Sequence, residues 1–195
     1  MKPAIKSLWS DAVSADLTTT RTLEGEHQAD VTIIGAGFCG LSAALHLAKA
    51  GVKVVCLEAE TIGWGASGRN NGQVIAGLKR DPEQVIKQLG AERAQPLIQC
   101  SGEAPDLVFS LIKQYGIDCD AVQKGWIQVG RSDKSIKEMQ SRVSQWQEFG
   151  APVEMLEPDQ LSKRLGTDWY KAGWIDKRGG SLNPLAYACG LAAAS

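Results

Sequence analysis

Hydrophobic positions between residues 31 and 57 change their spacing twice. A continuous apolar run, Val31–Ile34, predicts a buried strand, because strands covered on both faces lose the alternation of polar and apolar residues. A second apolar run over residues 53–57 predicts another strand. Between them, and before the helix-ending Gly51, apolar residues recur at helical spacing: Leu41, Ala44, Leu45 and Ala48. This order predicts a parallel βαβ unit.

Two helical regions are expected after this unit. Asp81 and Pro82 are typical of an N-cap and a first helical residue, so a short helix is expected to begin there. A longer helical region runs from residue 91 to about residue 115. Pro96 and Pro105 lie inside it, and we expect them to break or kink it, since proline removes a backbone donor and crowds the preceding turn.

From residue 116 the pattern changes to short strands separated by helices. Alternation over Trp126–Val129 predicts a half-buried strand, and the stripe of apolar residues over 133–149 predicts an amphipathic helix facing a core. The other expected elements are a short helix over 157–166, a strand over 172–175 and a helix from about residue 184. Residues 1–29 are polar, with Trp9 as the only large apolar anchor, and we expect little regular structure there.

Three glycines connect the first predicted strand to its helix. Gly35, Gly37 and Gly40 form a GxGxxG motif at the point where the chain must turn. In such a motif the first glycine permits the tight turn, the second lets the backbone approach a pyrophosphate, and the third lets helix and strand pack closely. Glu58, at the end of the second strand, can accept both hydroxyls of an adenosine ribose. The segment therefore predicts a dinucleotide site, for either a nicotinamide or a flavin cofactor.

A second loop distinguishes between these cofactors. Residues 63–73, GWGASGRNNGQ, are too rich in glycine for a helix interior or a strand. Ser67 offers a hydroxyl, Arg69 a cation for phosphate, and Asn70 and Gln73 polar groups for a flavin edge.

Together the two motifs resemble the D-amino acid oxidase superfamily of FAD-dependent flavoproteins, most closely its gamma-glutamylputrescine oxidase branch. The resemblance extends to YGIDCD at 115–120 and AGWIDKRGGSLNP at 172–184. It implies an α/β fold, in which a Rossmann-like FAD-binding domain is followed by the start of an α+β substrate domain. The implied divisions are an N-terminal arm (1–29), the FAD-binding part (30–115) and the beginning of the substrate domain (116–195).

The resemblance also implies the site and the reaction. The expected cofactor-binding residues are Gly35, Ala36, Gly37, Phe38, Cys39, Gly40, Glu58, Ala59, Gly65, Ala66, Ser67, Arg69, Asn70, Gly72 and Gln73. FAD would take a hydride from the carbon beside the nitrogen of a small amine, with dioxygen as the final acceptor. This chemistry requires no dedicated base, so no catalytic residue is assigned.

Two positions depart from the family pattern. Asn71 replaces an expected glycine, and asparagine tolerates positive φ better than most residues. Ser181 and Asn183 stand where related sequences often have histidines, which leaves the substrate open.

Composition excludes several classes of protein. The chain has 195 residues, 44% hydrophobic content and a formal net charge of −1, with no basic run for nucleic acid and no apolar run long enough to span a membrane. The N-terminus lacks the apolar core of a signal peptide, so we expect a cytoplasmic location. Five cysteines without a CxxC pair favour buried reduced thiols over disulfides or a metal site.

Other candidate residues have simpler explanations. His27 and His46 are expected on the surface, Asp118 and Asp120 read as solvated turn acids, and Ser67 lacks a neighbouring base that would make it a nucleophile. The last expected helix has no stop signal before Ser195, and family members continue well beyond this point, so we expect a truncated chain. Two alternatives stay open at this point: an NAD(P)-dependent dehydrogenase of similar architecture, or a noncatalytic remnant.

Overall fold

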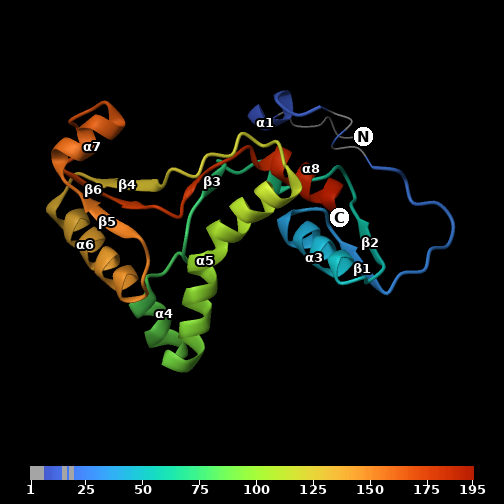
Figure 1. The fold of residues 1–195 in the computed structure, drawn as a ribbon, viewed down its shortest axis with the longest axis horizontal. Helices are drawn as coiled ribbons and strands as arrows, with labels where there is room; N and C mark the ends of the chain where they lie inside the picture. The colour runs from blue at the N-terminus through green and yellow to red at the C-terminus, as the bar shows by residue number, and fades with distance from the viewer. Residues whose placement is uncertain (1–6, 15–16, 18–19) are drawn as a thin grey trace. The chain divides into compact units, whose positions relative to one another are not determined.

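The computed structural model describes residues 7–14, 17 and 20–195 (Figure 1). The chain forms two compact units, and each is assembled from separated stretches of sequence. The first contains residues 1–72, 110–121 and 182–195, and the second contains residues 73–109 and 122–181. The predicted division into an arm, an FAD-binding part and a substrate part is a functional one, and it stays a prediction.

The first unit is built on the predicted βαβ motif. Strands β1 (Val31–Ile34) and β2 (Val54–Leu57) pair in parallel, with Val31 opposite Val54 and Ile34 opposite Leu57. Helix α3 (Phe38–Lys49) connects them and buries Leu41, Ala44 and Leu45, which confirms the apolar stripe. Fold class and βαβ order are as the sequence predicts, but the expectation that Val31–Ile34 is buried on both faces is wrong, because alternate residues of β1 are exposed and Ile34 is 89% exposed.

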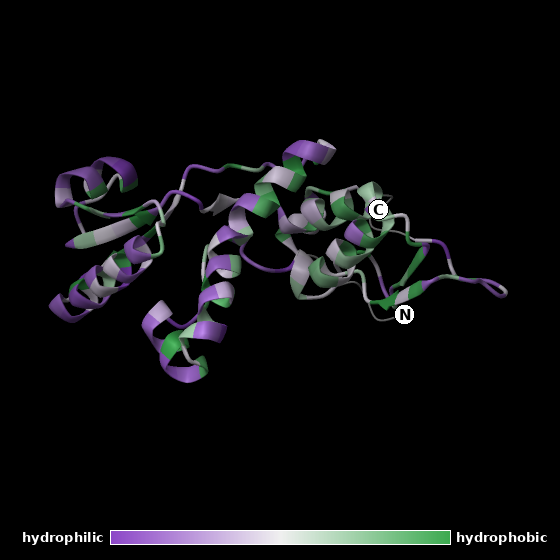
Figure 2. Ribbon diagram, turned by 60° about the horizontal axis from the view of Figure 1, so that its bottom comes forward, coloured by the Kyte–Doolittle hydropathy of each residue, from purple (hydrophilic) through white to green (hydrophobic). Residues whose placement is uncertain are grey.

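Helix α8 (Pro184–Ala194) completes the first unit by packing against α3 and against the short 3-10 helix η1 (Ala66–Gly68). Six of its residues are buried, and it is hydrophobic on almost all sides, as the colouring in Figure 2 shows. A helix without a polar face is stable only when it is covered on several sides. Its N-terminus is capped by Asn183, whose Oδ1 accepts hydrogen bonds from Leu185 N–H and Ala186 N–H.

The arm contains more structure than its sequence suggests. Residues Leu8–Asp11 form the short helix α1, an element that the sequence pattern did not predict. Ser7 and Ser10 form a reciprocal capping box, in which each side chain bonds the other residue's backbone N–H. A four-residue helix is too short to be stable alone, and α1 packs against α8.

The second unit is centred on an antiparallel sheet with the strand order β4 (Trp126–Gly130), β6 (Ala172–Asp176), β5 (Val153–Leu156). Alternation along β6 sends Trp174 to one face of the sheet and Ile175 to the other. Helix α6 (Asp133–Glu148) packs on the Trp174 face through Met139, Val143 and Trp146, and helix α7 (Pro158–Leu165) packs on the Ile175 face through Leu161. A two-residue pair, β3 (Gln73–Val74) with β7 (Gly180–Ser181), is also antiparallel.

Helices α4 (Pro82–Leu89) and α5 (Ala91–Tyr115) contribute Val85, Ala94 and Ile98 to the core on the Trp174 face. Helix α5 is continuous through Pro96 and Pro105, so of the two expected outcomes, a break or a kink, the break does not occur (Figure 1). Pro105 cannot donate to the carbonyl of Ser101, but that carbonyl accepts a 2.9 Å hydrogen bond from Gly77 N–H instead. A tertiary partner therefore satisfies the acceptor that the proline leaves open.

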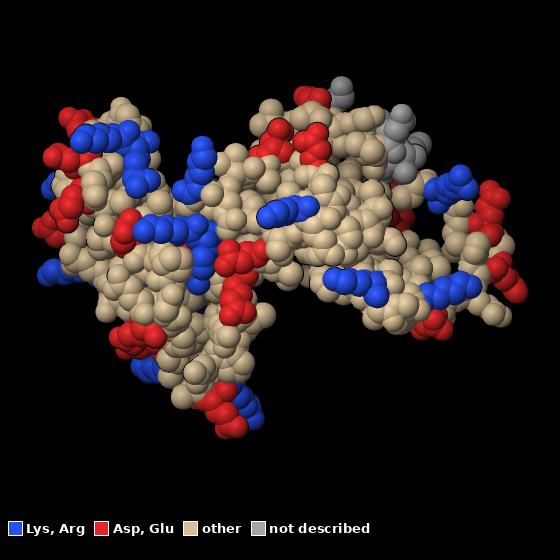
Figure 3. All heavy atoms as spheres, viewed as in Figure 1, with Lys and Arg blue, Asp and Glu red and all other residues tan. Residues whose placement is uncertain are grey.

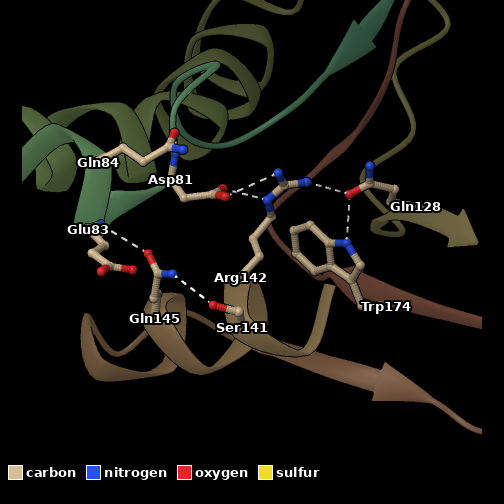
Figure 4. Close-up of polar contacts among 8 residues, drawn as sticks. All are labelled: Asp81, Glu83, Gln84, Gln128, Ser141, Arg142, Gln145 and Trp174. Carbon is tan, nitrogen blue, oxygen red and sulfur yellow. Dashed lines mark hydrogen bonds and ion pairs between the residues drawn. The ribbon is translucent and has the colours of Figure 1, made fainter. Parts of the chain in front are cut away.

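A polar network joins α4, α6 and the sheet (Figure 4). The Arg142 guanidinium makes two hydrogen bonds to the Asp81 carboxylate, at 2.5 and 3.2 Å, and a third to Gln128 Oε1 at 2.8 Å. The same Gln128 oxygen accepts from Trp174 Nε1 at 2.9 Å. Asp81 also caps α4, so one carboxylate fixes both the start of this helix and its attachment to α6.

Candidate functional site: a dinucleotide cradle at the end of β1

The turn between β1 and α3 requires glycine at two positions. Gly35 has φ +103°, a conformation that side chains disfavour, and its N–H donates to Leu57 O at 2.7 Å. A Cβ on Gly40 would lie 2.0 Å from Gly35 O and 3.2 Å from Ile33 Cγ2. The roles predicted for these two glycines, a tight turn and close packing of helix and strand, therefore match their surroundings.

Glu58 is attached directly to this turn. Its Oε2 accepts a 2.7 Å hydrogen bond from Ala36 N–H, and its Oε1 accepts one of 3.1 Å from Glu60 N–H. The side chain is half-buried, and Ala59 beside it is exposed. Two backbone donors fix the carboxylate next to the glycine turn, as a ribose-binding acid requires.

The second glycine-rich loop is attached to the same turn. Gly63 N–H donates to Ala36 O at 2.9 Å, and Phe38 N–H donates to Ser67 Oγ at 3.0 Å. A Cβ on Gly37 would lie only 3.0 Å from that hydroxyl oxygen. The structure thus brings the GxGxxG segment, Glu58 and the Ser67 loop together at one point.

The N-terminus of α3 lies in the middle of this cradle. Its N-cap is Gly37, which has no side chain to satisfy the first helical N–H groups, and Ser67 Oγ serves Phe38 from outside the helix. The next two residues, Cys39 and Gly40, carry N–H groups that have no intrahelical acceptor because of their position. Such groups and the helix dipole favour a negatively charged ligand such as pyrophosphate.

Other side chains of this loop make contacts within the loop itself. Asn70 Nδ2 donates to Ala66 O and Ser67 O, at 3.2 and 2.9 Å, and Asn70 Oδ1 accepts from Gly72 N–H at 2.8 Å. Arg69 is exposed and its guanidinium lies over the Trp64 ring, 4.5 Å from the ring centre. Gly65 and Ala66 are exposed, and Gln73 begins β3 in the other unit.

The positive φ considered for Asn71, at the position where the family pattern has glycine, does not occur. Asp120 is the one non-glycine residue with positive φ in the described part of the chain, so Asn71 does not adopt that conformation. Gly72 does so instead, with φ +72°, and a Cβ there would lie 2.3 Å from Leu182 O. Asn183 has a structural role as the buried cap of α8, and Ser181 is an exposed residue of β7 in the other unit.

The Cys56 thiol beside the glycine turn is not activated. The Cys56 thiol lies 3.7 Å from Gly35 O, and burial, reinforced by the Glu58 charge, raises its pKa. Cys119 and Cys189 are buried, whereas Cys39 and Cys100 are exposed, so the expectation of buried thiols is wrong for the latter two. His27, His46, Asp118 and Asp120 are all exposed, as predicted.

The sequence pattern does not identify two of the residues that contribute to this site. Gly63 was placed in the loop but given no role, although its N–H makes the link to Ala36 O. Trp9 was identified only as an apolar anchor, yet its indole N–H donates to Asn70 O at 2.8 Å. A large aromatic residue alone in a polar arm was the available signal.

A parallel βαβ unit with a glycine cradle at a helix N-terminus and an acid at the end of the second strand defines a dinucleotide-binding protein of the Rossmann-like class. The family model for FAD dependent oxidoreductases, DAO, matches residues 30–195, and the chain belongs to this family. FAD is therefore the cofactor that its family membership indicates.

Individual relatives agree with this assignment. The chain is 37% identical over 172 residues to gamma-glutamylputrescine oxidoreductase of Escherichia coli strain K12, covering 88% of this chain and 40% of the relative. It is 36% identical over 192 residues to the probable oxidoreductase OrdL of Haemophilus influenzae, covering 97% of this chain and 44% of that protein. The chain thus spans less than half the length of these curated relatives.

Solved structures show the same fold. Glycine oxidase from Geobacillus kaustophilus superposes with a TM-score of 0.68 at 25% identity, over 87% of this chain and 44% of that one. The L-amino acid deaminase from Proteus myxofaciens superposes with a TM-score of 0.72 at 23% identity, over 90% of this chain and 38% of that one.

Proposed function

We propose that this chain provides the adenosine- and pyrophosphate-binding part of an FAD-dependent amine oxidoreductase. The observation that carries the proposal is the convergence of three segments at one turn. Ala36 and Glu58 are 22 residues apart in sequence, and Phe38 and Ser67 are 29 apart, yet each pair is joined by a hydrogen bond. Gly37, at the centre of this turn, has no side chain to keep the backbone away from a phosphate.

The residues present fit the cofactor. Residues 35–40 would hold the pyrophosphate and Glu58 the ribose hydroxyls. Because Ser67 Oγ accepts from Phe38 N–H, its own hydroxyl proton is free to be donated to a phosphate oxygen. Arg69, Asn70, Gly72 and Gln73 would serve the phosphates and the flavin side, with Asn70 acting through the loop conformation that it maintains.

The proposed reaction is oxidation of a C–N bond. When bound, FAD supplies a two-electron acceptor for the hydride on the carbon beside the amine nitrogen. The amine becomes an imine, which water converts to an aldehyde and a smaller amine, and dioxygen takes the two electrons to give hydrogen peroxide. We infer a small amine resembling gamma-glutamylputrescine as substrate, on the strength of the 37% identical relative.

Two surface properties bear on other partners. None of the helices in the described part of the chain has the length and apolarity that a bilayer crossing needs. Lysine and arginine side chains are interspersed with acidic ones on the face shown in Figure 3, and such a surface does not favour nucleic acid. A cytoplasmic location stays a sequence-based prediction.

Titration of the purified chain with FAD, followed by flavin fluorescence, tests the cofactor assignment. Glu58→Ala should weaken binding by roughly ten- to a hundredfold, because it removes hydrogen bonds to a charged acceptor. Glu60→Ala is the matched control, since this exposed acid lies two residues away and contributes only its backbone N–H to Glu58. Absence of FAD binding, or displacement of FAD by NAD, would overturn the proposal.

Peroxide release in the presence of gamma-glutamylputrescine tests the reaction separately. Turnover would support the amine oxidoreductase activity for this chain. FAD binding without turnover would restrict the chain to cofactor binding, and would agree with the noncatalytic alternative.

A further inference from the structure

Trp9 contacts the cofactor loop from a distant part of the sequence. Its Nε1–H donates to the backbone carbonyl of Asn70 at 2.8 Å, although the two residues are 61 positions apart. The edge of its ring lies over Gly72, because a Cβ built on that glycine would be 3.4 Å from both Cζ2 and Cη2 of the indole. One side chain thus combines a hydrogen bond to Asn70 with an apolar contact to Gly72.

Hydrogen bonds outside any regular element hold Asn70 and Gly72 in place. Asn70, Asn71 and Gly72 lie outside the helices and strands of the structure, so no ladder of backbone hydrogen bonds holds them. The Asn70 side chain fixes one side of the segment through Ala66 O, Ser67 O and Gly72 N–H. Trp9 binds the remaining Asn70 carbonyl, and Leu182 N–H binds Gly72 O at 2.9 Å.

The helix that carries Trp9 is itself anchored. Ser7 and Ser10 cap α1, and α1 packs on α8, which in turn packs on η1 of the same loop. Trp9 is half-buried, whereas its neighbour Leu8 is 76% exposed. Trp9 is therefore more covered than the residue before it in α1.

We propose that Trp9 is a positioning residue, which holds Asn70–Gly72 in the conformation that the cofactor requires. Trp9 thereby contributes to the FAD site through the loop that it supports. The link to FAD rests on the proposed function, whereas the ordering of the loop by Trp9 does not.

The test compares Trp9→Phe with the unmodified chain. Phenylalanine keeps an aromatic ring over Gly72 and removes the N–H donor, so the loop should open about fivefold more often, the effect of losing one net hydrogen bond. Hydrogen–deuterium exchange measured without cofactor should therefore be about fivefold faster in peptides covering residues 66–72. Trp9→Ala should show a larger increase, since it also removes the ring contact.

Trp169→Phe is the matched control, because that indole is 62% exposed and lies in the second unit. It should leave exchange in residues 66–72 unchanged. Exchange in α6 should be unaffected in all variants, which separates ordering of the loop from general loss of stability.

Unchanged exchange of residues 66–72 in both Trp9 variants would overturn the proposal. FAD titration supplies the second measurement, and Trp9→Phe should raise the Kd by about fivefold. Faster exchange with an unaltered Kd would overturn the connection to the cofactor. If the unmodified chain binds no FAD, the proposed function fails, while the exchange measurement still decides whether Trp9 orders the loop.

Discussion

Gly37→Ala provides a sharp test of whether the glycine turn and the Ser67 loop form one interlocked unit. An added Cβ would lie 3.0 Å from Ser67 Oγ and 3.8 Å from Ser67 Cβ. Gly37 itself has φ −89° and ψ −177°, an extended conformation that alanine adopts without strain. Any cost of this substitution in the cofactor-free chain therefore arises from the hydroxyl of Ser67.

The magnitude follows from these distances. To relieve a 3.0 Å contact the hydroxyl must move away from Phe38 N–H, and weakening this external helix cap costs about 1 to 2 kcal/mol. Alanine also restricts the unfolded chain, which stabilises the folded state by about 0.4 to 1 kcal/mol. We expect a net destabilisation of between about 0 and 1.6 kcal/mol. In a Ser67→Ala background the contact is an ordinary 3.8 Å, so the same substitution should be neutral or stabilising.

A double-mutant cycle measures this coupling, which should be about 1 to 2 kcal/mol. The free energy of opening α3 in the cofactor-free chain is obtained from hydrogen exchange, because the two compact units need not unfold together. Additive effects of the two substitutions would refute the reasoning. FAD titration adds a separate criterion: Gly37→Ala should weaken FAD binding when Ser67 is present, because its Cβ displaces the hydroxyl proposed to donate to a phosphate oxygen, and should have little further effect in the Ser67→Ala background.

Three further predictions concern stability, each measured by urea unfolding. Gly40→Ala should cost about 2 to 3 kcal/mol and abolish FAD binding, because its Cβ would meet the Gly35 carbonyl; a loss below about 0.5 kcal/mol would contradict the packing described. Arg142→Met should cost about 1 to 2 kcal/mol, and adding Asp81→Asn should recover part of that loss, since the single change leaves a half-buried carboxylate without its cation. Burial, with the nearby Asp118 and Asp120 charges, raises the pKa of Cys119 from 9.0 to about 11, so the folded state retains this proton longer than the unfolded state. Stability should therefore fall between pH 9 and 11 by on the order of 2 kcal/mol, and Cys119→Ala should flatten this dependence; an identical slope in that variant would contradict the assignment.

Much of the local structure could be predicted from sequence, because it depends on neighbouring residues. The strand Val31–Ile34 and the start of α4 at Pro82 were correctly placed by an apolar run and by an N-cap followed by proline. The break considered at Pro105 does not occur, and the donor that satisfies Ser101 O comes from Gly77, which is distant in sequence. The periodicity of a helix contains no information about such a donor.

The functional site shows the same difference between what local sequence predicts and what tertiary contacts decide. Sequence alone determined the βαβ order, the three glycines and the acid after the second strand. Close turns and helix–strand contacts exclude residues larger than glycine, so the glycines recur at a fixed spacing that can be recognised in the sequence. Only the tertiary structure decided which atoms meet: Glu58 with Ala36, Ser67 with Phe38, and Trp9 with Asn70, across 22, 29 and 61 residues respectively. Each of these hydrogen bonds forms only after the intervening chain has packed, so its partners are selected by the folded geometry and not by local pattern.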